Sequence, residues 1–244
     1  MKLKVLYMKG KKMNVLIIIP AYNEQENIEN VVNNLLNNFT QYDYIVVNDG
    51  SKDNTKQICK HNHYNLLDLP INLGLAGGIQ AGFKYAYEQG YDYAIQFDGD
   101  GQHQPQYISF MLDEMKKKQV DIVIGSRFVK EKKPQNLRML GSNLISLIIK
   151  ITTGKRIHDP TSGMRLFNKK MIEKFAYSMN YGPEPDTISY LVRCGAKVEE
   201  VQVQMKEREA GESYLNMKRS IQYMLHMCMS IIFIQCFRKR EKLV

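Results

Sequence analysis

The sequence has few cysteines and lacks the long apolar runs of secreted or membrane-spanning chains. The cysteines are Cys59, Cys194, Cys228 and Cys236. They are scattered without metal-ligand spacing, which argues against a disulfide framework and suits a reducing cytosol. The basic segment 1–13 is not followed by a signal-length apolar region, because the run Val15–Ile19 is short and ends at Pro20. No internal repeat is found. The cysteine usage favours a cytoplasmic protein, and the composition is ordinary for a globular one.

The formal net charge is +9, which raises the question of nucleic-acid binding. The basic residues, however, are not interleaved with aromatic residues on one segment. They gather at the N-terminus, at 116–118, at 130–133 and at 238–242. The first three groups are interpreted as solvated faces or loops. The last borders an apolar segment, which indicates an anionic membrane surface instead.

Strand and helix patterns alternate along the first half of the chain. The predicted strands are Val15–Ile19, Tyr44–Val47, Tyr64–Leu69, Tyr91–Phe97, Val120–Gly125 and Val198–Val203. The predicted helices cover residues 28–39, 53–60, 74–88, 105–118, 137–153 and 185–194. Asn23 and Glu26 are interpreted as a capping box for the first helix, and His158–Arg165 as a polar loop. The alternation predicts an α/β fold with a mainly parallel sheet flanked by helices.

Three polar motifs, Pro20–Glu24, Asn48–Ser51 and Asp98–His103, each follow a predicted strand. In open parallel sheets, ligands bind beyond the carboxyl ends of the strands, so we expect these motifs at one edge. Asp98 and Asp100 are one residue apart and can converge on one hard cation. Such a cation, Mg²⁺ or Mn²⁺, leaves coordination positions for the phosphate oxygens of a substrate.

Six motifs together resemble a known family. They are Pro20–Glu24, Asn48–Ser51, Asn72–Gly74, Asp98–Asp100, Gly125–Arg127 and Asp159–Arg165. In this order and spacing they resemble family 2 glycosyltransferases, in particular the polyprenol-phosphate (dolichol-phosphate mannosyltransferase-like) branch. The resemblance implies a GT-A-type nucleotide-diphospho-sugar transferase domain at 14–213. A basic extension would precede it at 1–13, and an amphipathic, basic tail would follow at 214–244.

The resemblance assigns Pro20, Tyr22, Glu24 and Asp49 to binding of the nucleotide sugar. A carboxylate suits this role because it accepts hydrogen bonds from a base N–H or from ribose hydroxyls. The structural alternatives are a helix-start residue near the positive dipole end for Glu24 and a turn-stabilising residue for Asp49.

Asp98, Asp100 and Gln102 match the metal-binding positions of that branch. Asp98 would also contact the donor, and Asp100 is counted among the catalytic residues. A bound Mg²⁺ or Mn²⁺ would bridge the diphosphate and stabilise charge on the departing nucleotide.

Four arginines are also expected to bind substrate, namely Arg127, Arg138, Arg165 and Arg208. A guanidinium binds phosphate oxygens bidentately and stays charged. Arg138 can equally be a surface residue on its helix. Arg208 lies in a motif with Gly211 that resembles a loop able to close over the diphosphate, and the alternative is an ordinary surface loop.

Glu184 and Asp186 fall where family members carry the catalytic base. Direct displacement at the anomeric carbon inverts configuration, and a hydroxyl acceptor needs a base to take its proton. A phosphate acceptor is already ionised and needs none. Here the motif departs from the usual Glu-Asp dipeptide, so the choice between Glu184 and Asp186 stays open, with a helix-capping role as the alternative for Asp186.

The tail segment Ile221–Phe237 is mostly apolar, but Gln222, His226 and Ser230 are spaced to form one polar stripe on a helix. The segment is too short and too polar to span a bilayer. An interfacial helix anchored by basic residues within 218–240 fits better. The alternatives are a helix packed on the protein's own core or a site for a membrane-protein partner.

We therefore expect a peripheral enzyme on the inner face of the cell membrane. It would be a metal-dependent, inverting glycosyltransferase of cell-surface polysaccharide synthesis. The acceptor would be lipid-linked, either polyprenyl phosphate or a growing glycan. One alternative is a sugar-phosphate nucleotidyltransferase, which would want a glycine-rich basic loop where this chain has Pro20–Glu24. The other is a non-catalytic nucleotide-sugar-binding subunit, against which the intact acidic set argues.

Overall fold

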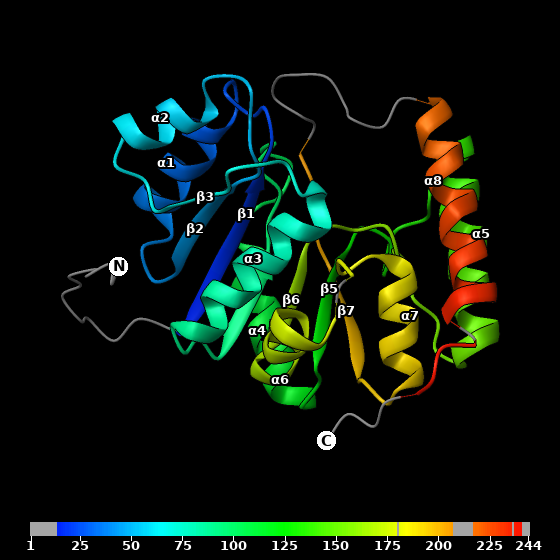
Figure 1. Cartoon of the computed structure of the whole chain (residues 1–244). Helices are drawn as coiled ribbons and strands as arrows, with labels where there is room; N and C mark the ends of the chain where they lie inside the picture. The colour runs from blue at the N-terminus through cyan, green and yellow to red at the C-terminus, as the bar shows by residue number, and fades with distance from the viewer. Residues whose placement is uncertain (1–13, 180, 207–216, 236, 241–244) are drawn as a thin grey trace.

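The computed structural model describes residues 14–179, 181–206, 217–235 and 237–240. The predicted extension at 1–13 and the loop that carries Arg208 lie outside these residues. In the described part, one sheet lies between two layers of helices (Figure 1). The predicted α/β class with a mainly parallel sheet is confirmed.

The strands form where β-branched and other apolar residues run without interruption. They are β1 (Val15–Ala21), β2 (Asp43–Asn48), β3 (Leu66–Asp68), β4 (Tyr93–Gln96), β5 (Ile122–Ser126), β6 (Arg165–Asn168) and β7 (Val198–Gln202). Their order in the sheet is β3-β2-β1-β4-β6-β5-β7. All neighbours pair in parallel except β6, which is antiparallel to both β4 and β5.

Residues along β1 alternate between two hydrophobic cores. Leu16 and Ile18 face one core, whereas Ile17 and Ile19 face the other, as the period of two in a strand requires. The second core is closed by α1 (Ile28–Asn38), α2 (Thr55–His61) and α4 (Tyr107–Lys118). The first is closed by α3 (Gly74–Glu88), α5 (Leu137–Thr153), α6 (Lys169–Glu173), η1 (Lys174–Ser178), α7 (Pro185–Arg193) and α8 (Met217–Met229). Because both faces of the sheet are covered, β1 is apolar at almost every position.

Sequence patterns did not predict β6 or the short helices α6 and η1. The strand has four residues and follows the predicted polar loop, so its apolar pair Leu166 and Phe167 gives too short a signal. Its register places Arg165 opposite Gln96 of β4 and Ile124 of β5. The strand therefore brings the loop before it to the same edge as the ends of β4 and β5.

The C-terminal helix, made of α8 and the π-helical turn η2 (Ser230–Gln235), packs along α5 at one side of the molecule (Figure 1). Met224, Met227 and Ile231 are buried, whereas Leu225 and Phe233 are exposed. The predicted amphipathic helix is thus present, and one of its faces lies against the protein's own domain. Among the described helices, none is long and apolar enough to cross a bilayer.

The predicted polar stripe of this helix is wrong in one member. Gln222 and His226 are exposed, but Ser230 is only 3% exposed. The chain changes there from α8 to the π-helical turn η2 (Ser230–Gln235), which has more residues per turn and shifts the pattern. The buried hydroxyl of Ser230 is satisfied because it donates to Asp186 Oδ2 over 2.6 Å.

We expect Gly141 to be required for the contact between α5 and α8. A Cβ atom at this position would lie 1.7 Å from Met224 Sδ and 2.8 Å from Met224 Cγ. Gly141→Leu should lower the free energy of unfolding by about 1–3 kcal/mol, as overpacking does, in urea denaturation. Asn143→Leu, at an exposed position of the same helix, is the control. If Met224→Ala does not restore the stability that Gly141→Leu loses, the expected contact between these two residues is contradicted.

Candidate active site at the carboxyl edge of the sheet

The first two polar motifs interlock beyond the ends of β1 and β2. Asn23 N donates to Ser51 Oγ over 3.0 Å, and Lys52 N donates to Asn23 Oδ1 over 2.9 Å. Asn23 has a left-handed backbone with φ of 57°, and α1 begins only at Ile28. The predicted capping box is therefore wrong, because the Asn23 side chain holds the neighbouring loop rather than a helix end. Asparagine tolerates this conformation better than most residues.

The predicted donor-binding carboxylates lie in the same two loops. Glu24 Oε2 accepts a hydrogen bond from Asn27 Nδ2 over 2.8 Å, at the start of α1. Asp49 is buried, and its Oδ1 accepts from Leu73 N over 2.7 Å, just before α3. Tyr22 is 38% exposed. These residues thus lie between the ends of β1 and β2 and the N-terminus of α3.

The acidic loop after β4 lies against the first motif. A Cβ atom on Gly99 would lie 3.2 Å from Pro20 O and 3.8 Å from Glu24 Cγ. The predicted convergence of the three motifs at one edge of the sheet is therefore confirmed. The reason is topological, because β2, β1 and β4 are adjacent and parallel.

His103 and Gln102 support the acidic loop from within. His103 is buried, and its Nδ1 accepts from Asp98 N over 2.9 Å. Its proton is then on Nε2, which lies 3.5 Å from Asp98 Oδ2. Gln102 N donates to Asp100 Oδ1 over 3.1 Å, and the Gln102 side chain donates to Lys206 O. The loop therefore presents its two aspartates, of which Asp98 has a side chain 36% exposed.

The donor set fits a metal that is shared with a substrate. Within the described ranges, no three His, Cys, Asp or Glu side chains form a metal-binding group. Asp98 and Asp100 together offer two carboxylates from one loop. Mg²⁺ is commonly held by one or two carboxylates with substrate phosphates as the remaining ligands. The residues thus fit a metal–diphosphate site rather than a closed protein cage.

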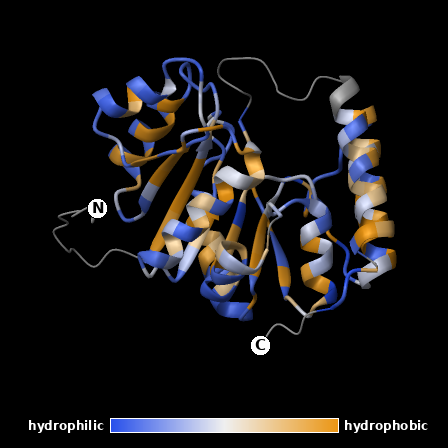
Figure 2. Ribbon diagram, viewed as in Figure 1, coloured by the Kyte–Doolittle hydropathy of each residue, from blue (hydrophilic) through white to orange (hydrophobic). Residues whose placement is uncertain are grey.

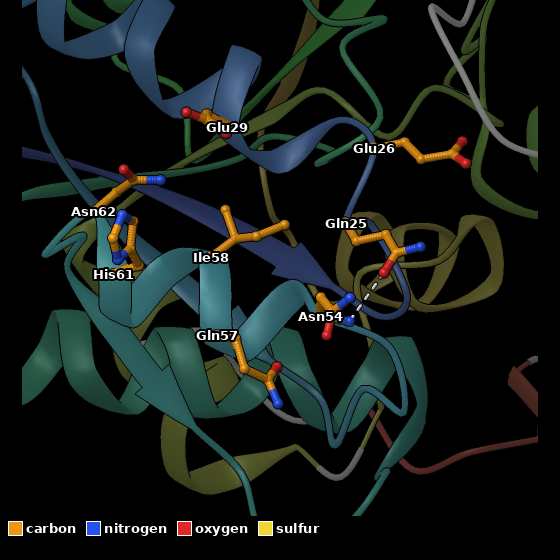
Figure 3. Close-up of a pocket in the computed structure, with 8 residues that line it drawn as sticks. All are labelled: Gln25, Glu26, Glu29, Asn54, Gln57, Ile58, His61 and Asn62. Carbon is orange, nitrogen blue, oxygen red and sulfur yellow. Dashed lines mark hydrogen bonds between the residues drawn. The ribbon is translucent and has the colours of Figure 1, made fainter.

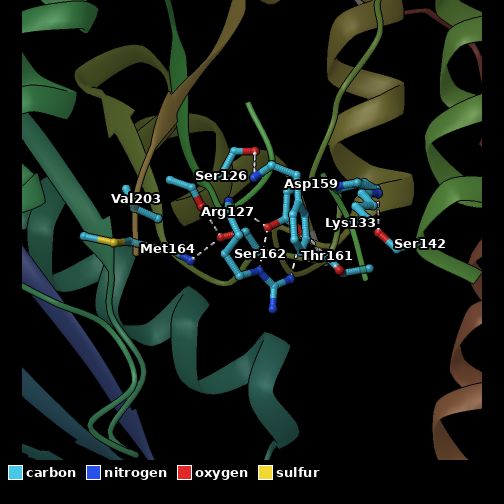
Figure 4. Close-up of polar contacts among 12 residues, drawn as sticks. Ser126, Arg127, Lys133, Ser142, Asp159, Thr161, Ser162, Met164 and Val203 are labelled. Carbon is cyan, nitrogen blue, oxygen red and sulfur yellow. Dashed lines mark hydrogen bonds and ion pairs between the residues drawn. The ribbon is translucent and has the colours of Figure 1, made fainter. Parts of the chain in front are cut away.

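Arg127, directly after β5, is held by a buried carboxylate (Figure 4). Arg127 Nε and Nη2 donate to the two oxygens of Asp159 over 2.7 and 2.9 Å. Asp159 is fully buried, and its backbone N donates to Glu200 Oε1 over 2.9 Å. Lys133 lies nearby, where it donates to Ser142 Oγ over 2.9 Å. Burial lowers the pKa of the Lys133 ammonium, and the Asp159 carboxylate opposes this effect.

The other predicted arginines differ in accessibility. Arg138 is exposed on the first turn of α5. Arg165 is only 3% exposed, and its Nη2 donates to Pro160 O over 2.7 Å. Its buried Nε has no hydrogen-bond partner, and neither has the buried Oε1 of the cross-strand Gln96. Arg165 thus supports the loop, whereas Arg127 and Arg138 are placed nearer to solvent.

Glu184 and Asp186 both lie at the N-terminus of α7, under the C-terminal helix. Glu184 Oε2 accepts a hydrogen bond from Tyr223 Oη of α8. Asp186 is 7% exposed, and its oxygens accept from Thr187 N over 2.8 Å and Ser230 Oγ over 2.6 Å. Asp186 is therefore enclosed by protein donors, and Glu184 is the more accessible of the two.

Sequence reasoning missed three residues of this region. Lys133 belongs to a charge run interpreted as solvated, yet it is half-buried. Asp159 stands in a family-like motif but was given no role of its own, although a carboxylate close to an arginine motif was a usable signal. Tyr223 carried no signal, because a tyrosine on an amphipathic helix looks like any other apolar residue.

A groove between α1 and α2 lies apart from these residues (Figure 3). Asn54 N donates to Gln25 Oε1 over 3.0 Å at its rim. It is lined by none of the predicted site residues. We therefore place the active site at the carboxyl edge of the sheet rather than in this groove.

The chain is similar in sequence to several known proteins. The family model for glycosyl transferase family 2 matches residues 16–175. The undecaprenyl-phosphate mannosyltransferase of Micrococcus luteus is 32% identical over 84% of this chain and 88% of its own. The UDP-N-acetylglucosamine–dolichyl-phosphate N-acetylglucosaminyltransferase of Methanococcus voltae is 37% identical over 65% of this chain and 71% of its own.

A solved structure supports the fold. Glucosyl-3-phosphoglycerate synthase from Mycobacterium tuberculosis, in complex with Mn²⁺, uridine diphosphate and phosphoglyceric acid, superimposes with a TM-score of 0.63. It is 17% identical and the match covers 92% of this chain and 79% of that one. The sheet and its flanking helices therefore have a GT-A-type fold.

The family match extends this result. The chain belongs to glycosyl transferase family 2 and is a glycosyltransferase. The predicted family and enzyme class are confirmed, and the nucleotidyltransferase alternative is wrong. The region that the family model matches ends before Glu184, Asp186 and the C-terminal helix.

We expect Gly163 to fix the position of Asp98. A Cβ atom on Gly163 would lie 2.6 Å from Asp98 Oδ2, so Gly163→Ala should displace that carboxylate. Misplacement by about 1 Å costs on the order of 100-fold in rate. We expect a loss of this order in turnover and a higher Mn²⁺ concentration for half-maximal activity.

The control is Gly90→Ala. Gly90 has a φ of 76° at the end of a helix, away from the acidic loop, so this variant loses stability without touching the site. Equal Mn²⁺ dependence in Gly163→Ala and wild type would contradict the expected contact.

Proposed function

We propose that the protein is a metal-dependent, inverting glycosyltransferase that transfers a sugar from a nucleotide diphosphate to polyprenyl phosphate. The observation that carries the proposal is the meeting of the Asp98–Asp100 loop with Pro20 and Glu24 at one edge of the sheet. The names of the two relatives given above include undecaprenyl phosphate and dolichyl phosphate, which supports a polyprenyl phosphate acceptor. The reaction would serve cell-surface polysaccharide synthesis.

On the donor side, Tyr22, Glu24 and Asp49 are proposed to hold the base and ribose. The oxygens of Glu24 and Asp49 can accept from base N–H groups and ribose hydroxyls. Asp98 and Asp100 would hold Mg²⁺ or Mn²⁺ on the diphosphate. When bound, the metal supplies charge stabilisation to the departing nucleoside diphosphate.

On the acceptor side, the available charges favour a phosphate over a glycan hydroxyl. Asp186 is enclosed by protein donors, and Glu184 already accepts from Tyr223. An ionised phosphate needs no base, whereas a hydroxyl does. Glu184 is then proposed to accept from a sugar hydroxyl of the donor. Arg127 and Arg138 are proposed to attract the lipid phosphate, as guanidinium groups do.

The helices beside this region offer a surface for the lipid part of the acceptor. On α5, Leu140, Leu144, Leu147 and Ile151 are 46–73% exposed, and Leu225, Met229 and Phe233 of the C-terminal helix are 56–57% exposed. Both helices show orange stretches at the side of the molecule in Figure 2. Arg138, Lys150, Lys239 and Arg240 add exposed basic side chains. We propose that this surface lies on the inner face of the cell membrane, because apolar side chains with basic neighbours are typical of interfacial helices.

The metal role is tested with Asp100→Ala. We expect turnover of the preferred nucleotide sugar, found with a panel of donors and polyprenyl phosphate, to fall at least about 100-fold, because the metal supplies several kcal/mol. Mn²⁺ binding in the presence of nucleoside diphosphate should weaken in calorimetric titration.

Asp113→Ala, at an exposed position of α4, is the matched control. Full activity of Asp100→Ala would refute the metal site. Transfer by wild type to a glycan hydroxyl and not to polyprenyl phosphate would refute the acceptor. No turnover of any donor by wild type would refute the proposed reaction.

The membrane surface is tested with Leu144→Glu combined with Leu225→Glu. Each exposed leucine that enters lipid contributes about 1.5–3 kcal/mol at full burial, so flotation with phosphatidylglycerol vesicles should fall at least about tenfold. Phe110→Glu, an equally exposed residue on α4, should float like wild type. Undiminished flotation of the double variant would contradict the proposal, and absence of wild-type flotation would favour a membrane-protein partner.

A further inference from the structure

The C-terminal helix donates hydrogen bonds to both acidic residues at the N-terminus of α7. Tyr223 Oη donates to Glu184 Oε2, and Ser230 Oγ donates to Asp186 Oδ2 over 2.6 Å. Gln235 Nε2 reaches the same oxygen of Asp186 at 3.4 Å. A helix that otherwise resembles a simple anchor thus binds two carboxylates that lie far from it in sequence.

The N-terminus of α7 belongs to the active edge of the sheet. A Cβ atom on Gly182 would lie 2.9 Å from Ala76 Cβ in the first turn of α3. That turn follows Leu73, whose backbone N binds Asp49. Glu184 therefore lies two residues from a segment that touches the donor-binding side of the site.

The Tyr223 hydroxyl is suited to remain a donor. Burial, and then the neighbouring Glu184 carboxylate, raise the pKa of the Tyr223 phenol well above its ordinary value of 10.0. The positive charge of Arg165 acts on the same phenol in the opposite direction. Arg165 begins β6, two residues after Gly163, where an added Cβ atom would lie 2.6 Å from Asp98 Oδ2. The phenol therefore keeps the proton that it donates to Glu184 Oε2.

We propose that Tyr223 is a positioning residue for the transfer reaction, which holds the Glu184 carboxylate in the orientation that the donor sugar requires. The inference rests on the proposed function of Glu184 as a donor-sugar contact. Ser230 holds Asp186 in the same way. Its hydrogen bond fixes the first turn of α7 next to the Tyr223–Glu184 pair. The helix that faces the membrane on one side therefore completes the active site on the other.

The test is Tyr223→Phe, which removes one oxygen atom and keeps the ring. Release of nucleoside diphosphate is measured with the donor that wild type prefers, with and without polyprenyl phosphate. We expect kcat to fall about tenfold to 100-fold, as displaced groups do, while half-saturation by Mn²⁺ stays within about twofold. A purely structural role would instead lower thermal stability and leave kcat of the folded enzyme unchanged.

Tyr177→Phe is the matched control, because Tyr177 Oη donates to Glu88 Oε1 over 3.3 Å, in a Tyr–Glu pair on helices other than α7 and α8. It should retain wild-type kcat. In a Glu184→Ala background, which removes the acceptor, Tyr223→Phe should cause no further loss, since the tyrosine acts through that carboxylate. Independent, multiplicative losses of the two variants would overturn the proposal.

Two further outcomes keep the inference separate from the proposed function. If wild type hydrolyses the donor but does not use polyprenyl phosphate, the acceptor is wrong, and the effect of Tyr223→Phe on hydrolysis still decides the inference. If wild type uses polyprenyl phosphate and Tyr223→Phe matches its kcat, only the inference fails. Should Tyr223→Phe not fold, Ser230→Ala is compared with Ser109→Ala, a serine of α4 whose hydroxyl donates to Gln106 O. Unchanged kcat in Ser230→Ala then overturns the proposal that the C-terminal helix positions the acidic residues of α7.

Discussion

The proposed acceptor side of the site depends on the buried carboxylate of Asp159. It accepts from the backbone N, Nε and Nη2 of Arg127, and its own backbone N is held by Glu200. A buried charge is tolerated only when it is paired and hydrogen-bonded, and loss of a partner costs about 3–5 kcal/mol in comparable buried pairs. Because the Arg127 side chain is partly exposed, we expect loss of either partner of the Arg127–Asp159 pair to cost an amount near the lower end of this range. The pair fixes the end of β5 to the loop before β6, and that loop carries Gly163 to Asp98.

The proposed donor side depends on strand order instead of on a single charge. β2, β1 and β4 are parallel neighbours, so the loops at their ends share one edge. Asn23 and Gly99 then bring these loops into contact. Two kinds of constraint, one electrostatic and one topological, thus meet at the acidic loop.

Much of the fold followed from sequence, because long elements have clear periods. The ranges of α3 and α5 were predicted at both ends, and the convergence of three motifs followed from parallel strands. Strand β6 was missed because its four residues hold only two apolar side chains. The capping role of Asn23 was wrong because its partner, Lys52, comes from another loop. Contacts between distant segments, such as Tyr223 with Glu184, leave no local pattern in either segment.

The C-terminal helix has a consequence for how freely its sequence can vary. Met224 fills the space left by Gly141, Tyr223 and Ser230 face carboxylates, and Leu225 and Phe233 face outward. Each side of the helix therefore has different surroundings, namely the α5 helix, the two carboxylates and the exterior of the protein. A shift of one residue along the chain would move every side chain by about 100° around the axis and break all of these contacts at once. We therefore expect substitutions in this helix to be tolerated far better than insertions or deletions, a pattern more usual for a core element than for an anchor.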